Sequence, residues 1–115
     1  MKMYQHKFLA KGAWNKLSLH QQLANVGSEV ERAIKWRSKN NLNFSRQAFN
    51  RALELFDLTL GDKKNKKRLK EISRARELFA DYIIGENIYN SSDELWQKYF
   101  YSFNYLSRLN LSTPN

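Results

Sequence analysis

The sequence predicts an all-α fold, namely an antiparallel up-and-down four-helix bundle with an N-terminal extension. Apolar residues recur every three or four positions in four segments, and no segment alternates between apolar and polar residues as a half-buried strand would. The chain has only 4 Gly and 1 Pro in 115 residues, and short polar loops between the segments favour antiparallel neighbours. We expect helices at residues 18–38, 45–60, 65–84 and 92–109. The expected organisation is an N-terminal extension at 1–17, the bundle at 18–110 and a C-terminal tail at 111–115.

The first two expected helices each carry one apolar stripe. Ser18 and Gln21 form a capping-box pair that predicts where the first helix begins. The stripe of the first helix consists of Leu19, Leu23, Val26, Val30, Ala33 and Ile34. The stripe of the second helix, which is expected to begin near Ser45, consists of Ala48, Phe49, Ala52, Leu53, Phe56 and Leu60. Gly61 follows the second helix, where a left-handed residue often ends a helix.

The third and fourth helices are expected to follow the same pattern. Asp62 or Asn65 can cap the third helix, and Gly85 is placed to end it as Gly61 ends the second. The fourth is unusual, because six of the ten residues at 96–105 are aromatic. Four of these aromatic residues share one helical face: Trp96, Tyr99, Phe100 and Phe103.

Some large side chains project away from the apolar stripes of their helices. A contiguous apolar patch left open on a monomer is unfavourable in water, so we expect at least two of these side chains to lie in a subunit or partner interface. The expected interface residues are Trp36, Leu58, Tyr101 and Tyr105. The N-terminal extension also contains aromatic residues, through which we expect it to dock on the bundle.

The composition limits the classes of function. The chain has no Cys, which excludes disulfides and thiolate zinc sites, and no apolar run long enough to cross a bilayer. We therefore expect a cytoplasmic protein that does not enter the membrane. The net charge of +9, from 20 basic and 11 acidic residues, favours a polyanionic partner such as RNA or DNA, although it could also serve solubility alone.

Residues suited to catalysis or metal binding are scarce. His6 and His20 are the two histidines, and no Glu-x-x-His pair of the ferritin-like kind is present. The carboxylates of Glu54, Glu77 and Asp81 project away from the apolar stripes, so we expect them on the solvated surface. No Gly-rich phosphate loop is present either. We expect a non-enzymatic protein with no catalytic residues, metal, cofactor or small-molecule substrate.

The densest charge cluster is the candidate nucleic-acid-binding site. It lies at the start of the third helix, where the helix dipole favours anions and disfavours lysines, so local stability alone would not select it. A phosphate would satisfy both the basic side chains and the free N–H groups of the first turn. A solubility role for the same charges remains the alternative. The candidate residues are Lys63, Lys64, Lys66, Lys67, Arg68, Lys70 and Arg74.

Two further groups have both a structural and a functional interpretation. Arg76 falls on the flank of the third stripe, and we expect a structural ion pair with Asp57, with Glu29 as the other candidate partner. A ligand-facing or subunit-facing role is the alternative. Trp36 is surrounded by basic residues, at Arg32, Lys35, Arg37 and Lys39. It either covers the edge of the core or acts as a stacking or interface residue.

Three segments resemble a family of small uncharacterised bacterial all-α proteins: QLANVGSEV at 22–30, ALELFDLT at 52–59 and DELWQKYFY at 93–101. This resemblance covers residues 14–108 and implies a domain without naming an activity. In size, basic charge and layout the chain is also similar to the four-helix-bundle proteins of ribosomal-RNA intervening sequences and the accessory proteins of diversity-generating retroelements. The second resemblance implies a ring-shaped oligomer, which in the accessory proteins works beside a reverse transcriptase and its RNA.

A third resemblance concerns nuclease activity. Residues 76–82, RELFADY, resemble the Arg-to-His nuclease motif of the HEPN helical bundles, but Asp81 stands where that motif has His. Without the imidazole, acid–base cleavage of RNA does not carry over. The sequence therefore predicts a basic, oligomeric accessory protein that binds nucleic acid or a nucleic-acid enzyme. The alternative is a protein–protein interaction module, such as an antitoxin-like or scaffold subunit, that does not bind nucleic acid.

Overall fold

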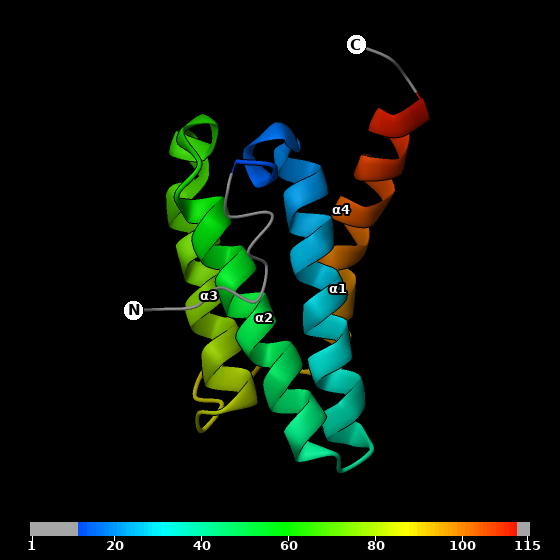
Figure 1. The fold of residues 1–115 in the computed structure, drawn as a ribbon. Coiled ribbons are helices and arrows are strands. Elements are labelled where there is room, and N and C mark those ends of the chain that lie inside the picture. The colour runs from blue at the N-terminus through cyan, green and yellow to red at the C-terminus, as the bar shows by residue number, and fades with distance from the viewer. Residues whose placement is uncertain (1–11, 113–115) are drawn as a thin grey trace.

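The computed structural model describes residues 12–112, with side chains through residue 108, and these residues form an all-α bundle. The four long helices run alternately up and down (Figure 1), as the sequence predicts. Their bounds are α1 Leu19–Ser38, α2 Leu42–Leu60, α3 Leu69–Ile83 and α4 Asp93–Ser112, with two 3₁₀ turns, η2 Trp14–Lys16 and η3 Lys63–Arg68. None of the helices within 12–112 has the length and apolar composition that a bilayer crossing requires.

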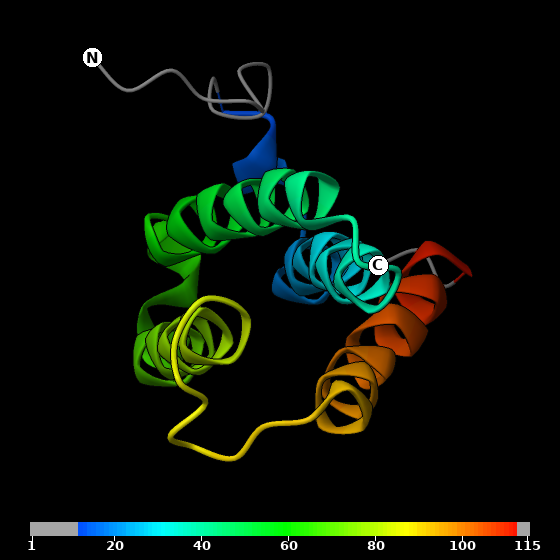
Figure 2. The same ribbon diagram turned by 90° about the horizontal axis from the view of Figure 1, so that it is seen from below.

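The helices form a ring in which α1 packs closely against both α2 and α4, and α2 packs against α3. Figure 2 shows this ring from below, with the connection between α3 and α4 crossing its remaining side. The backbones of α3 and α4 approach each other less closely than the other neighbours do. Long side chains therefore have to fill this side, which is where the aromatic residues of α4 lie.

The core contains one stripe from each helix. Phe49 and Phe56 of α2 contact Phe79 of α3, and Phe79 contacts Trp96 of α4 at 5.6 Å between ring centroids. The ring of Trp96 stacks on that of Phe100 at 5.9 Å. These contacts carry the hydrophobic core across the ring from α2 to α4.

The helix ends agree only in part with the sequence predictions. The capping box is confirmed: the Gln21 N–H donates to the Ser18 hydroxyl at 3.2 Å, and the Gln21 side chain accepts from the Ser18 N–H at 2.9 Å. The prediction of left-handed residues at Gly61 and Gly85 is wrong, since Gly61 has a φ of −79° and Gly85 has no positive φ. Among the described residues other than glycine, those with a left-handed backbone are Asn40, Asn87 and Asn90. The short polar side chain of asparagine tolerates this conformation.

Two helices also start at other residues than expected. Helix α2 begins at Leu42 rather than near 45, because the Asn41 side chain caps it by accepting from the Phe44 N–H at 3.0 Å. Ser45 is instead buried, and its hydroxyl donates to the Ala33 carbonyl at 2.7 Å. Helix α3 begins at Leu69 rather than at 65, since residues 63–68 form a 3₁₀ turn.

At the end of the bundle away from η3, a polar cluster joins the end of α3 to α1 and α4. Arg37 donates to the Tyr82 carbonyl at 2.8 Å, and its guanidinium lies 4.3 Å from the centroid of the Tyr82 ring. The Tyr82 hydroxyl donates to Asp93, the first residue of α4, which also pairs with Arg37 at 3.6 Å. Burial and the neighbouring Asp93 carboxylate raise the pKa of Tyr82, so its hydroxyl keeps its proton at neutral pH. This cluster ties the first residue of α4 to α1 and α3, while the Ser92 hydroxyl caps α4 by accepting from the Leu95 N–H at 3.2 Å.

Candidate nucleic-acid interface

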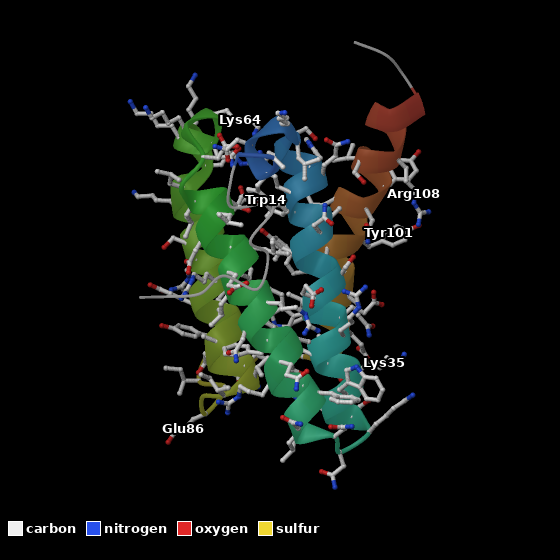
Figure 3. All side chains as sticks on the ribbon, viewed as in Figure 1. Trp14, Lys35, Lys64, Glu86, Tyr101 and Arg108 are labelled. Carbon is white, nitrogen blue, oxygen red and sulfur yellow. The ribbon has the colours of Figure 1, made fainter. Side chains whose placement is uncertain are left out.

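The candidate basic residues lie together at one end of the bundle, on η3 and the first turns of α3. Figure 3 labels Lys64 at this end, near Trp14, and nitrogen-tipped side chains project outward from the turn. The segment at 62–76 contains eight basic and two acidic residues, and so carries six of the nine net positive charges. Most of the net positive charge of the protein therefore comes from this segment.

A buried polar network holds the turn in place. Asn65, which is 2% exposed, points inward and donates to the Gln22 side chain at 2.8 Å and to the Thr59 carbonyl at 2.9 Å. Gln22 in turn donates to the Trp14 carbonyl at 3.0 Å and to the Asp62 carboxylate at 2.8 Å. These contacts join η3 to α1, to the end of α2 and to η2, so the basic turn is anchored on three sides.

The turn also buries a tryptophan from the expected N-terminal extension. Trp14 is a core residue, and its indole N–H donates to the Thr59 hydroxyl at 3.3 Å. The Thr59 hydroxyl donates to the Leu55 carbonyl at 2.7 Å, so every polar atom in this chain of contacts has a partner. The rest of the expected extension, at 1–11, lies outside the described residues.

Three of the candidate residues are already paired with carboxylates, namely Lys64, Arg68 and Arg74, and the first two lie in the turn itself. The Lys64 ammonium donates to Asp62 and to the Asn15 carbonyl at 3.0 Å. The pKa of Asp62 lies below its ordinary value. Burial acts to raise this pKa, but the hydrogen bonds from Lys64 and Gln22 lower it by more. Arg68 pairs with Glu71 at 2.8 Å, which lowers the pKa of Glu71. Lys64 and Arg68 therefore contribute to the structure of the turn as well as to its charge.

The other lysines of the run point into solvent. Lys63, Lys66, Lys67 and Lys70 are exposed, and no carboxylate of the described residues lies within 4.0 Å of their ammonium groups. Each ammonium is a mobile point charge on a flexible stem. The arrangement thus offers four available positive charges on a firmly held backbone.

Arg74 connects this charged end to a groove between α3 and α4. Its guanidinium lies 4.7 Å from the centroid of the Tyr89 ring, and 3.9 Å from the Glu77 carboxylate. The groove has a volume of about 380 Å³ and is lined by residues of α3, α4 and the loop between them. Its lining includes Glu71, Arg74, Leu78, Tyr89, Leu95, Trp96 and Tyr99. No sequence pattern marks Tyr89, which lies in the loop, so sequence analysis missed this groove.

The four expected interface residues occupy different environments. Tyr101 and Tyr105 of α4 are 72% and 56% exposed. Leu58 is half-buried against the core, and Trp36 is half-buried with its ring 5.0 Å from that of Phe44. The structure therefore leaves the two tyrosines open, whereas Leu58 and Trp36 already have contacts within the chain.

The ion pair expected for Arg76 is formed with Asp57, with its Nε 2.8 Å from the carboxylate. Glu29, the other candidate, pairs with Arg51 at 2.8 Å and with Arg32. The expectation of a solvated Glu54 is wrong, because this side chain is 6% exposed.

In the part of the chain with described side chains, no three His, Asp or Glu residues come together as a metal-binding group. No family model matches the chain, and no curated protein or solved structure is significantly similar to it.

Proposed function

We propose that this protein is a non-enzymatic accessory subunit that binds RNA or DNA through the phosphates. The supporting observation is the group of four exposed lysines on the network-held turn: Lys63, Lys66, Lys67 and Lys70. Like charges held close together repel one another, and a polyanion relieves that repulsion. The architectural resemblance to accessory proteins that work beside a reverse transcriptase and its RNA supports the same proposal.

The chemistry of these lysines determines the expected mode of binding. Ammonium groups attract phosphates without reading base edges, so they position a nucleic acid rather than select a sequence. The affinity should be on the order of micromolar at physiological salt, as for nonspecific binding. It should also fall steeply with ionic strength, because each phosphate contact releases counterions.

The test removes lysines that have no carboxylate partner among the described residues and keeps Lys64, whose loss would leave Asp62 buried without its ammonium. The variant is Lys63→Ser, Lys66→Ser and Lys67→Ser. Fluorescence anisotropy with a structured RNA and a DNA duplex across a salt series gives the affinity and the salt slope. Loss of three phosphate contacts should weaken binding and reduce the steepness of log K against log salt concentration by about 2–3. Circular dichroism should show unchanged helix content.

A matched control removes the same charge from elsewhere on the surface. The control is Lys35→Ser, Lys39→Ser and Lys98→Ser, all of which are exposed. Both variants lose three positive charges, so a general effect of net charge would weaken both equally. We expect the control to keep most of its affinity and slope. No salt-dependent binding by the wild type, or equal losses in the two variants, would overturn the proposal.

The second candidate function is a protein–protein interaction module, and the exposed tyrosines of α4 favour it. Tyr101 and Tyr105 lie near Leu106, which is 37% exposed, so one end of α4 presents apolar surface. Exposed tyrosines beside other apolar side chains are typical of the central part of protein–protein interfaces. Light scattering with and without Tyr101→Glu plus Tyr105→Glu tests self-association. A wild type that stays monomeric at high concentration, unchanged by the double substitution, would rule out a homo-oligomer.

A further inference from the structure

We propose that the groove between α3 and α4 takes an unstacked base from a single strand of RNA or DNA. This proposal rests on the proposed function, because the phosphates of the same strand would contact the basic turn. The groove, of about 380 Å³, has the size and the largely apolar, aromatic lining of a ligand site. Tyr89, Trp96 and Tyr99 supply three aromatic rings to its walls.

The position of Arg74 connects base and phosphate contacts. Arg74 lines the groove and stacks near the Tyr89 ring, at 4.7 Å from its centroid. Lys70 lies one helical turn before it on α3, about 6 Å along the axis. Bases stack on tyrosine rings and on the planes of arginine guanidinium groups, and such stacking tolerates any sequence. A strand whose backbone contacts Lys70 therefore lies within one helical turn of Arg74 and of the groove that Arg74 lines.

Polar groups on residues that line the groove favour a base over an apolar protein side chain. The indole N–H of Trp96 is buried, in a residue that is 6% exposed, and has no acceptor among the described residues. The Tyr99 hydroxyl contacts Glu71 at 3.4 Å, and burial, with that carboxylate, raises its pKa to about 12. The hydroxyl therefore keeps its proton at neutral pH and donates it to Glu71, and the remaining lone pairs of the two groups can accept from a base amino group. Base edges carry donors and acceptors that such groups can meet, whereas apolar side chains carry none.

Tyr89 is the residue to change, because its side chain lies outside the hydrophobic core. It is 45% exposed, and its contribution to holding the loop comes from its backbone N–H, which donates to Asp81 at 3.2 Å beside the Ile88 N–H at 3.1 Å. Tyr89→Ser removes the ring and keeps that bond. Tyr105→Ser is the matched control, since Tyr105 is 56% exposed and does not line the groove.

The experiment compares a short single-stranded RNA that contains a fluorescent purine analogue with the same sequence as a duplex. Anisotropy gives the two affinities, and quenching of the analogue reports stacking. We expect quenching of the single strand by the wild type and by Tyr105→Ser. Tyr89→Ser should bind the single strand on the order of tenfold more weakly and lose the quenching. Its affinity for the duplex, whose bases stay paired, should not change.

The outcomes separate this proposal from the proposed function. If neither RNA binds in a salt-dependent way, and the DNA duplex used to test the proposed function does not bind either, the proposed function fails and the groove proposal fails with it. If only the DNA duplex binds, the groove proposal alone is overturned. If both bind but the single strand is not quenched, the lysines contact phosphates and the groove proposal alone is overturned. The same holds if Tyr89→Ser and Tyr105→Ser behave alike. In either of those cases the groove is left for an apolar side chain of a protein partner.

Discussion

The buried network beneath the basic turn makes a quantitative prediction about Asn65. Asn65→Ala removes two hydrogen bonds, to the Gln22 side chain and to the Thr59 carbonyl. The Thr59 carbonyl keeps the Asp62 N–H as a donor at 3.3 Å, but the Gln22 oxygen is left buried without its partner. One lost bond and one unsatisfied buried acceptor together cost about 2–4 kcal/mol of unfolding free energy. For a domain of this size, the midpoint temperature should fall by roughly 10 °C.

Urea denaturation followed by circular dichroism measures this change, and Asn25→Ala is the control. The Asn25 side chain also donates to a backbone carbonyl, that of Gln21 at 2.9 Å, but on the exposed face of α1. Water replaces that bond, so Asn25→Ala should lie within about 0.5 kcal/mol of the wild type. The burial argument is refuted if Asn65→Ala is equally mild, or if the two substitutions cost the same.

Two further predictions concern packing and pH. In Gly27→Ala, the new Cβ would lie 2.8 Å from the Cβ and Cγ of Phe100, so we expect a net loss of about 1–2 kcal/mol despite better helix propensity. In Gly61→Ala, the nearest atom to the new Cβ is 3.4 Å away, so the free energy of unfolding should rise by about 0.4–1 kcal/mol. The urea midpoints of Gly27→Ala and Gly61→Ala should therefore move in opposite directions, and a shift in the same direction would contradict this packing. The folded-state pKa of Tyr99, about 12 against 10.0, means that folding stability should fall as pH rises from 10 to 12. Tyr99→Phe should make the free energy of unfolding less dependent on pH between 10 and 12. If urea denaturation gives the same pH dependence for Tyr99→Phe and the wild type, the Tyr99 hydroxyl is not buried as the structure has it.

The fold could be predicted from the sequence because it depends on periodicity and local caps. The apolar stripes placed all four helices, and the Ser18–Gln21 pair gave the start of α1. The start of α3 was wrong because Asn65 is held by Gln22, 43 residues away, and no local pattern shows such a contact. Glu54 was assigned to the surface for a related reason: helical projection shows which way a side chain leaves its own helix, but not what lies there.

The candidate site was visible from the sequence only as a run of charge. The sequence alone shows the run of basic residues. Which of them are paired with carboxylates, as Lys64 and Arg68 are, depends on the three-dimensional structure. Lys64 has its carboxylate two residues away, at Asp62, and that pairing becomes evident only once Asp62 is seen to be buried. The groove could not be predicted, because it depends on how far apart α3 and α4 lie and on where a nine-residue loop places Tyr89.

The anchoring of the turn bears on what the lysines are for. Charge that only keeps a protein soluble works equally well on a loosely held loop, whereas a binding site gains affinity when its backbone is fixed beforehand. Asn65→Ala loosens the turn without removing a single positive charge, so it separates the two roles. If the lysines bind phosphates, this variant should bind RNA more weakly than the wild type, with a nearly unchanged salt slope, under conditions where both are folded. Equal affinity in the folded variant would mean that the network serves stability alone, and that the placement of the lysines has no part in binding.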